Sequence, residues 1–159
     1  MKSYFSTILL LVLLSCNSEL KNTKLNGLIF GTFYEITYSA KGNNNYQKQL
    51  DNIFDAVNKS MSNYQPDSDI SKVNRHELDV VDRYFVEVFM AAKKIYDQTD
   101  GIFDPTIGKL VNAWNFGSEE YKTKPDSLKI DSLMRYVGFD KIRLKNNVLI
   151  KNDPKPYID

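Results

Sequence analysis

The stretch TDGIFDPTIGKLVNAWNFG, residues 99–117, carries the densest backbone punctuation of the sequence. Gly101 and Gly108 bracket an aromatic residue, an acid, a proline and a threonine, and the only tryptophan of the chain follows. Because proline suits the first turn of a helix, we predict a short helix over 105–114. Asp104 precedes this proline and should be extended, so its carboxylate stays off the helix. That carboxylate either caps the helix or accepts hydrogen bonds from a ligand, and both alternatives stay open.

The composition indicates one globular domain. The chain has 159 residues and its hydrophobic content is 42%, which is ordinary for a packed core. Its 21 basic and 20 acidic residues give a formal net charge of +1. No net field therefore attracts a polyanion, and we expect no binding of nucleic acid.

The N-terminus has the pattern of an export signal. Residues 1–15 contain a short apolar run that is too short to span a bilayer. The sequence LLSC ending at Cys16 resembles a bacterial lipobox, and this only cysteine has no intrachain disulfide partner. We expect a lipoprotein signal peptide over 1–15, a lipid on Cys16 and a polar tether over 16–26. The protein would then be lipid-anchored to a bacterial membrane on the extracytoplasmic, periplasmic side. The alternative is an ordinary signal peptide with an incidental cysteine.

The rest of the chain predicts an α+β fold of antiparallel strands and several packed helices. Alternation of apolar and polar residues predicts one strand over 27–39, with Tyr34, Ile36 and Tyr38 on one face and a bulge or close approach at Gly31. Periodicity and turn residues predict the remaining elements: a helix over 46–64, a largely buried helix from about 82 that Gly101 caps, a helix over 125–137, a hairpin over 141–152 turning at Asn146-Asn147, and the start of a strand at 156–159.

This ending suggests a longer protein. A chain that stops inside an apolar strand leaves backbone groups unpaired. We therefore interpret the sequence as the first part of something longer. The alternative is a natural terminus that packs as an edge strand.

Several common kinds of site are missing from the sequence. His76 is the lone histidine, no cysteine pair exists, and neither a P-loop nor a glycine-rich dinucleotide motif appears. We expect His76 to be a solvated surface residue. Besides the opening stretch, two segments stand out: the Phe30-Gly31-Thr32 run, and residues 61–74, where Tyr64 before a proline could stack on a base or an isoalloxazine. The plain alternatives are a bulge for the first and a capped helix start for the second.

Together these segments resemble a known family. The sequences GTFYEITY, MSNYQPDSDISKVN, TDGIFDPTIGKLVNAWNFG and PYID occur in the order and spacing of the ApbE family, the FAD:protein FMN transferases. The resemblance covers about 27–159 and matches only the N-terminal half of the family domain. It implies a truncated ApbE-like, T-fold-related architecture.

The resemblance also implies an activity. The family moves FMN from FAD to a threonine hydroxyl of an acceptor protein in a Mg²⁺-dependent reaction that releases AMP. The acceptor would be a subunit of an electron-transport or sodium-pumping membrane complex. Two alternatives are an FAD pyrophosphatase, which makes FMN and AMP, and a non-catalytic flavin-binding lipoprotein.

The resemblance carries candidate flavin-binding residues by position. They are Phe30, Tyr64, Ile102, Phe103, Asp104 and Asp159. Many members have methionine where this chain has Phe30. The family's metal ligands lie in a glycine-rich segment after the ID pair and in a later aspartate motif, neither of which is present here. Catalytic residues are therefore unassigned, and we expect residues 1–159 by themselves to lack transferase activity.

Overall fold

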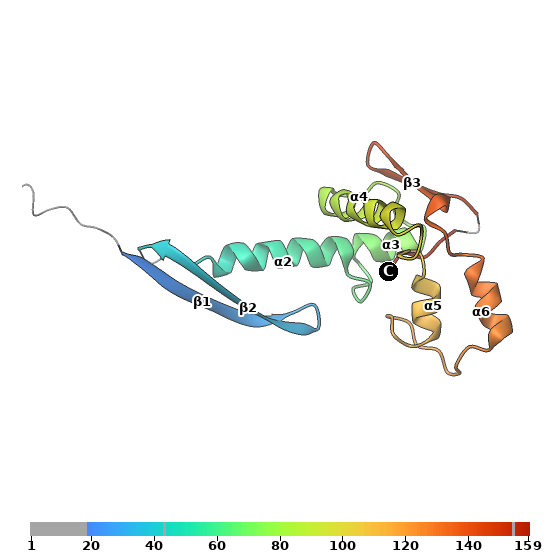
Figure 1. Cartoon of the computed structure of the whole chain (residues 1–159), viewed down its shortest axis with the longest axis horizontal. Helices are drawn as coiled ribbons and strands as arrows, with labels where there is room; N and C mark the ends of the chain where they lie inside the picture. The colour runs from blue at the N-terminus through green and yellow to red at the C-terminus, as the bar shows by residue number, and fades with distance from the viewer. Residues whose placement is uncertain (1–18, 43, 154) are drawn as a thin grey trace, which may run out of the picture. The chain divides into compact units, whose positions relative to one another are not determined.

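The computed structural model describes residues 19–42, 44–153 and 155–159, in two compact units that span 1–51 and 52–159. The expected signal peptide over 1–15 and the lipid site at Cys16 lie outside the described residues. Figure 1 labels the elements in chain order: β1 (Leu20–Ile29), β2 (Thr32–Lys41), α2 (Gln47–Met61), α3 (Asp69–Asn74), α4 (Arg83–Gln98), α5 (Gly108–Ala113), α6 (Ser127–Met134), the 3-10 turn η1 (Phe139–Lys141), β3 (Ile142–Lys145) and β4 (Val148–Lys151). None of the helices in the described ranges combines the length and apolar character that crossing a membrane requires.

The first unit contains an antiparallel hairpin. β1 and β2 pair from Leu20 opposite Lys41 to Ile29 opposite Thr32. Phe30 and Gly31 between them have φ of 52° and 74°, the positive values that the tight type I′ turn requires. The prediction of one strand over 27–39 with a bulge at Gly31 is therefore wrong, because the chain reverses direction there.

Part of the expected tether belongs to this hairpin. Residues 20–26 form the first seven positions of β1, so the prediction of a polar tether is wrong for them. Leu25 is buried and lies opposite Ile36, while its two neighbours along the strand are exposed. An antiparallel strand with one solvated face can be as polar as a linker. The predicted shared face of Tyr34, Ile36 and Tyr38 is confirmed, since every second residue of β2 is partly buried.

In the second unit, polar caps fix where two helices begin. Ser68 accepts a hydrogen bond from the backbone of Ser71 at 3.2 Å and starts α3, which confirms the capped helix start within residues 61–74. Asp82 accepts one from the backbone of Phe85 at 2.8 Å and starts α4. Side-chain oxygens at these positions satisfy N–H groups that have no partner inside the helix.

The end of α4 differs in detail from the expectation. Asp100 takes the left-handed position with φ of 52°, one residue before Gly101. Gly101 follows with φ of 78°, and its N–H donates to the carbonyl of Tyr96 at 2.9 Å. These are the features of a Schellman ending, in which aspartate occupies the position that glycine more often fills.

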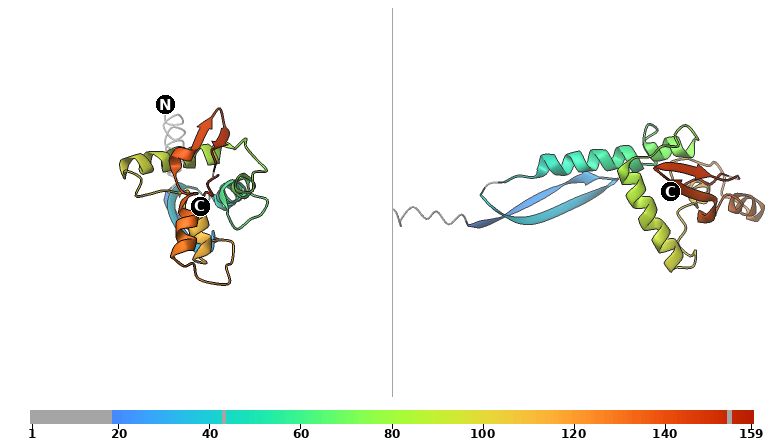
Figure 2. Two further views of the ribbon diagram at one scale, coloured as in Figure 1. Left: turned by 90° about the vertical axis from the view of Figure 1, so that its right-hand side faces the viewer. Right: turned by 90° about the horizontal axis from the view of Figure 1, so that it is seen from above.

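The short helix predicted over 105–114 begins later than expected. α5 starts at Gly108 and not at residue 105, because Asp104 and Thr106 close a separate turn over Pro105. α6 is likewise shorter than the expected 125–137. α5 and α6 lie side by side, as both Figure 1 and Figure 2 show.

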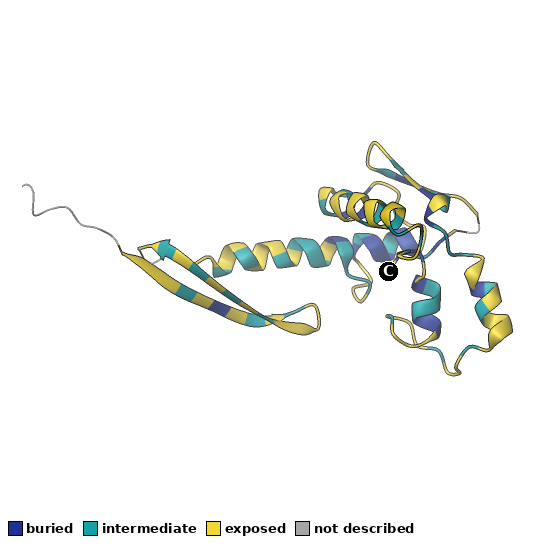
Figure 3. Ribbon diagram, in the orientation of Figure 1, coloured by how far each residue is buried: buried dark blue, intermediate teal, exposed yellow. Residues whose placement is uncertain are grey.

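The core of the second unit joins α3, α4 and the β3–β4 hairpin. The predicted turn of this hairpin is confirmed: Asn146 and Asn147 have φ of 50° and 61°. Figure 3 shows buried positions gathering in α3, while much of α4 is exposed. The prediction of a largely buried helix from about residue 82 is therefore wrong, because only Phe85 and Phe89 of α4 are buried. The buried apolar cluster comprises Ile70, Val73, Val81, Phe85, Phe89, Phe139, Ile142, Leu149 and Ile158.

The closing residues run parallel to the segment that leads into α5. Gly108 donates its N–H to the carbonyl of Tyr157 at 3.1 Å, and Asp159 donates to the carbonyl of Pro105 at 2.9 Å. The expected strand is thus a short extended segment with one parallel bridge, between Ile107 and Tyr157. A Cβ atom at Gly108 would lie 2.5 Å from the ring of Tyr157, so glycine permits this approach.

The buried side chain of Asn74 holds the closing segment in place. Its Oδ1 accepts from the N–H of Ile158 at 2.9 Å, and its Nδ2 donates to the carbonyl of Ile158 at 2.8 Å. Nδ2 also donates to Oδ1 of Asn63 at 3.2 Å. One amide therefore satisfies both backbone groups of a buried residue, which would otherwise be costly to desolvate.

Lys151 reinforces the same attachment. Its ammonium donates to the carbonyls of Pro156 at 3.0 Å and Val73 at 3.2 Å, and to Oδ1 of Asn74 at 3.4 Å. Burial, with a smaller contribution from the charge of Lys155, lowers the pKa of Lys151 from 10.5 to about 8. A lysine in this position is fixed by three acceptors but is costly to keep charged.

The attachment through Asn74 can be tested against a matched buried asparagine. We expect Asn74→Ala to lower the free energy of unfolding by about 3 kcal/mol, because it leaves both backbone groups of Ile158 unpaired. Asn112 is also buried, but its amide nitrogen lacks a partner and its oxygen accepts only a long 3.5 Å bond from Glu119. Asn112→Ala should therefore cost only about 1 kcal/mol. Urea unfolding followed by the fluorescence of the single tryptophan measures both, and equal losses would contradict the role given to Asn74.

Lys151 makes a prediction about pH. The pKa is lowered in the folded state, so between pH 8 and 10.5 the unfolded chain binds more protons and the free energy of unfolding rises with pH. Across this window, the free energy of unfolding of the wild type should rise, relative to that of Lys151→Met, by at most about 3 kcal/mol. Unfolding midpoints at several pH values measure the gain, and Lys93→Met controls for the loss of one charge. A difference that stays constant from neutral to alkaline pH would contradict the prediction.

Candidate functional site

The six residues predicted to bind flavin divide between the two units. Phe30 belongs to the first unit, and the other five belong to the second. Phe30 is 55% exposed and adopts a positive φ, which is rare for a bulky side chain. Such a conformation needs support from its surroundings and is often found at functional positions. The β1–β2 turn therefore presents an aromatic ring at its tip.

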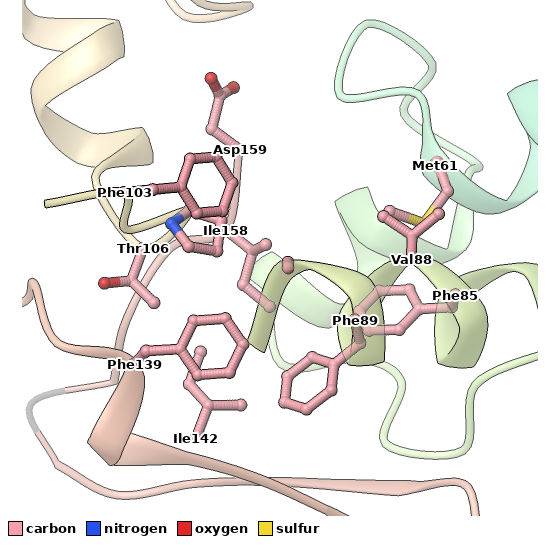
Figure 4. Close-up of a pocket in the computed structure, with 12 residues that line it drawn as sticks. Met61, Phe85, Val88, Phe89, Phe103, Thr106, Phe139, Ile142, Ile158 and Asp159 are labelled. Atoms are coloured by element: carbon pink, nitrogen blue, oxygen red, sulfur yellow. The ribbon is translucent and has the colours of Figure 1, made fainter. Parts of the chain in front are cut away.

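The second unit has an apolar pocket beside residues 99–117. Figure 4 shows Phe103 and Asp159 at one side of it and Phe85, Val88 and Met61 at the other. The pocket has a volume of about 110 Å³. Its lining, apart from Asp159 and one threonine, is hydrocarbon: Met61, Phe85, Val88, Phe89, Ala92, Phe103, Pro105, Phe139, Ile142 and Ile158. It can cover an apolar part of a ligand but is too small for a whole dinucleotide.

Asp159 contributes a carboxyl at the rim of this pocket. In Figure 4 its oxygens point away from the apolar lining. Its Oδ1 accepts a hydrogen bond from Nδ2 of Asn63 at 3.3 Å. Partial burial raises the pKa of Asp159, and the bond from Asn63 opposes this rise. The group is thus positioned to accept hydrogen bonds from hydroxyls or ring nitrogens.

Asp104 has a structural partner. Its Oδ1 accepts from the backbone N–H of Thr106 at 2.8 Å and from the Thr106 hydroxyl at 2.6 Å. The same hydroxyl oxygen accepts from the N–H of Gly138 at 2.7 Å. α5 has no side-chain cap, so the alternative that Asp104 caps this helix is wrong. Instead, Asp104 fixes the turn that places Phe103.

Two further candidates are exposed side chains. Ile102 is 91% exposed and Tyr64 is 72% exposed. The Tyr64 hydroxyl donates to the carbonyl of Phe116 at 3.3 Å, which ties the loop after α2 to the loop after α5.

The structure therefore brings five of the six candidates to one part of the second unit. Asn63 links Tyr64 to Asp159, because it adjoins the first in sequence and bonds to the second. Pro105 links the same Asp159 to the segment that holds the other three. That these residues contact flavin stays a prediction. Asn63 was not among the predicted site residues, although it directly precedes Tyr64 within residues 61–74.

A metal centre finds no ready set of ligands here. Across residues 19–159, positions 43 and 154 apart, no three histidine, cysteine, aspartate or glutamate side chains gather in a way that could hold an ion. The carboxyls of Asp104 and Asp159 each have the neighbours described above. The residues present do not fit a magnesium site, and we assign no ligand to this ion.

The comparisons with known proteins agree on one family. The ApbE family profile matches residues 30–159. The FAD:protein FMN transferase of Vibrio cholerae serotype O1 is 30% identical over 161 residues, which cover 94% of this chain and 47% of that protein. The enzyme of the same name from Haemophilus influenzae is 31% identical over 163 residues, again with 94% and 47% covered. The chain thus spans about half the length of the curated relatives it matches.

Solved structures share the fold. The flavin transferase ApbE from Vibrio cholerae has a TM-score of 0.81 at 29% identity, covering 89% of this chain and 48% of that one. The flavinyl transferase ApbE of Pseudomonas stutzeri has a TM-score of 0.79 at 22% identity, covering 88% and 47%, and shows the fold alone. The predicted α+β, ApbE-like class is confirmed. With most of its length matched by the family profile and by these structures, the chain belongs to the ApbE family.

Proposed function

We propose that this chain supplies the flavin-nucleotide surface of an FAD:protein FMN transferase. The observation that carries the proposal is the meeting of Phe103 and Asp159 at the rim of one apolar pocket, with Asn63 joining Tyr64 to the same rim. The relatives that match the chain carry the name of this enzyme. An aromatic ring, an apolar recess and a carboxyl acceptor are the groups that a flavin, with its apolar ring and polar edge, requires.

The proposed reaction is a phosphoryl transfer to a protein side chain. The threonine oxygen of the acceptor forms a bond to the FMN phosphorus of FAD, and the pyrophosphate bond to AMP breaks. The hydroxyl proton leaves to solvent or to the released phosphate. Catalysis of this kind depends on positioning and on keeping water away from the phosphorus. In the proposal, Phe103 and the hydrocarbon behind it exclude water from one side of the bound flavin, and Asp159 orients it.

Magnesium is part of the proposal only as the ion that would neutralise the pyrophosphate when bound. The acceptor is proposed to be a subunit of an electron-transport or sodium-pumping membrane complex. Attachment to the outer face of a bacterial membrane through Cys16 is likewise proposed from the sequence. Radiolabelled palmitate incorporated by the wild type, but not by Cys16→Ser, tests this anchor.

Flavin binding by the described surface makes a direct prediction. We expect Tyr64→Ala to raise the Kd for FAD by about 2- to 12-fold, because it removes an aromatic contact worth about 0.5 to 1.5 kcal/mol. Tyr64→Phe keeps the ring and loses only the hydroxyl bond to Phe116, so it should bind nearly as the wild type does. Quenching of FAD fluorescence by the 159-residue chain measures all three. Leu128→Ala is the control for loss of an exposed apolar side chain on α6.

The reaction itself is tested by its products. FAD, magnesium and a threonine-containing acceptor are mixed with the chain, and AMP and covalently bound flavin are measured. Our expectation is FAD binding without transfer by residues 1–159 alone, so covalent flavin on the acceptor would prove that expectation wrong. AMP and FMN without an acceptor would indicate hydrolysis. No change in Kd with Tyr64→Ala would remove the support for the proposed surface.

A further inference from the structure

A second hollow of the same unit has a different chemical character. It is a wide depression that is open to solvent, with a volume of about 600 Å³, and it is lined by His76, Lys109, Tyr136, Asp153 and Lys155. None of these residues lines the apolar pocket. They come from the loop after α3, from α5, from the turn after α6 and from the segment after β4. Four stretches far apart in the sequence thus place mainly basic side chains around one space.

An adjoining cavity extends the same charge. It has a volume of about 150 Å³, shares His76 and Lys155 with the hollow, and adds Lys151 and Asp79. Within the described part of the chain, no carboxylate forms an ion pair with Lys109, Lys151 or Lys155. The three lysines therefore outnumber the two acids of these cavities, and the ammonium groups of Lys109 and Lys155 remain available to an anion.

Two of the three ammonium groups are held in position. That of Lys109 lies 3.4 Å from the centre of the Tyr136 ring, a cation–π contact that orders the side chain. That of Lys151 is fixed by the bonds to Val73, Asn74 and Pro156. Positioning before binding lowers the entropy that a ligand must overcome. The arrangement is therefore more than a set of mobile surface lysines.

His76 lies among the charged groups of the hollow. The residue is exposed, as predicted, and its backbone N–H donates to Val73 at 3.2 Å while φ is 64°. Desolvation lowers the pKa of His76 from 6.5, and the charges of Lys151, Lys155 and Lys109 lower it further, while Asp153 opposes them. A bound anion would reverse the effect of the lysines and favour the imidazolium.

We propose that this hollow binds a phosphate group, with Lys109, Lys155 and His76 as its direct partners and Lys151 contributing charge. Lysine and histidine act as compact donors that approach an anion from several sides. The hollow contains no arginine, so its cationic donors are lysines, which bind phosphate as point charges. The proposal does not rest on flavin transfer, because it uses none of the residues assigned to that surface.

Binding and protonation are linked in this site. If phosphate raises the titration midpoint of His76 by about one pH unit, reciprocity requires that a given ionic form of phosphate bind about tenfold more tightly when His76 is charged than when it is neutral. Tyr136, Asp79 and Asp153 also face the hollow or its extension. The titration must therefore be followed at the histidine itself.

The lone histidine makes the experiment direct. The 159-residue chain, labelled with ¹³C-histidine and held in a non-ionic detergent, is titrated with pH in inorganic phosphate and in sodium chloride of equal ionic strength. We expect the midpoint of His76 to rise by about one pH unit in phosphate alone, with saturation. Lys109→Ala and Lys155→Ala should each reduce the apparent affinity for phosphate about fivefold or more.

Lys93→Ala is the matched control, because Lys93 also lies over a tyrosine ring, that of Tyr96, but outside the hollow. It should leave the phosphate effect unchanged. An equal midpoint in phosphate and chloride, or an equal loss in all three lysine variants, would overturn the proposal. Should Lys109→Ala unfold the chain, the exposed Lys155 decides the outcome.

The same signal separates the sources of phosphate. Adenosine monophosphate and vesicles of phosphatidylglycerol are compared with phosphatidylcholine vesicles as the uncharged reference. A shift with the nucleotide alone assigns the site to a soluble phosphate, and a shift with the anionic vesicles alone assigns it to a lipid headgroup. A shift with neither, even though inorganic phosphate binds, would limit the site to the free ion and overturn its use for a larger ligand.

Discussion

The side-chain amide of Asn74 pairs with both backbone groups of Ile158, 84 residues further along the chain. No strand of the described chain lies beside Ile158 on that side to accept and donate these bonds. A single buried side chain therefore replaces the neighbouring strand that would satisfy them in a sheet. The cost of leaving buried backbone groups unpaired makes this position of the closing segment the favourable one. The position of Asp159 at the rim of the apolar pocket depends on it.

The site follows from this attachment in two steps. With Ile158 fixed, Asp159 reaches the carbonyl of Pro105, and Tyr157 reaches the N–H of Gly108. The turn at Pro105 is in turn closed by Asp104 and by the buried Thr106, whose hydroxyl also accepts from Gly138. Motifs that are separated by dozens of residues thus share one rim because each supplies a backbone or hydroxyl partner to the next.

Sequence reasoning succeeded where the pattern is local and failed where the decisive partner is distant. The apolar periodicity of α4 and the paired asparagines at 146 and 147 identify their own structures, and both were predicted. The predicted start of α5 was wrong, because it depends on the hydrogen bond that Asp104 accepts from Thr106. Residues 20–26 were predicted to be a linker, because their partner strand β2 lies beyond a turn that contains Phe30 with a positive φ. An aromatic residue at that position gives no local signal of a turn. No local pattern identifies the distant partner of either asparagine, which is Asp159 for Asn63 and Ile158 for Asn74.

The polar character of the attachment explains its specificity. An apolar side chain at position 74 would bury a similar area. It would not, however, distinguish between alternative positions of an extended segment, because hydrophobic contact has no direction. The amide has two groups of opposite sense at fixed separation, and they match the N–H and carbonyl of one residue. Shifting the segment by one residue would lose both bonds to Asn74, the bond of Asp159 to Pro105 and the approach of Gly108 to Tyr157 together. The carboxyl of Asp159 is therefore positioned by directional hydrogen bonds. The apolar pocket beneath it contributes burial but does not determine the register of residues 156–159.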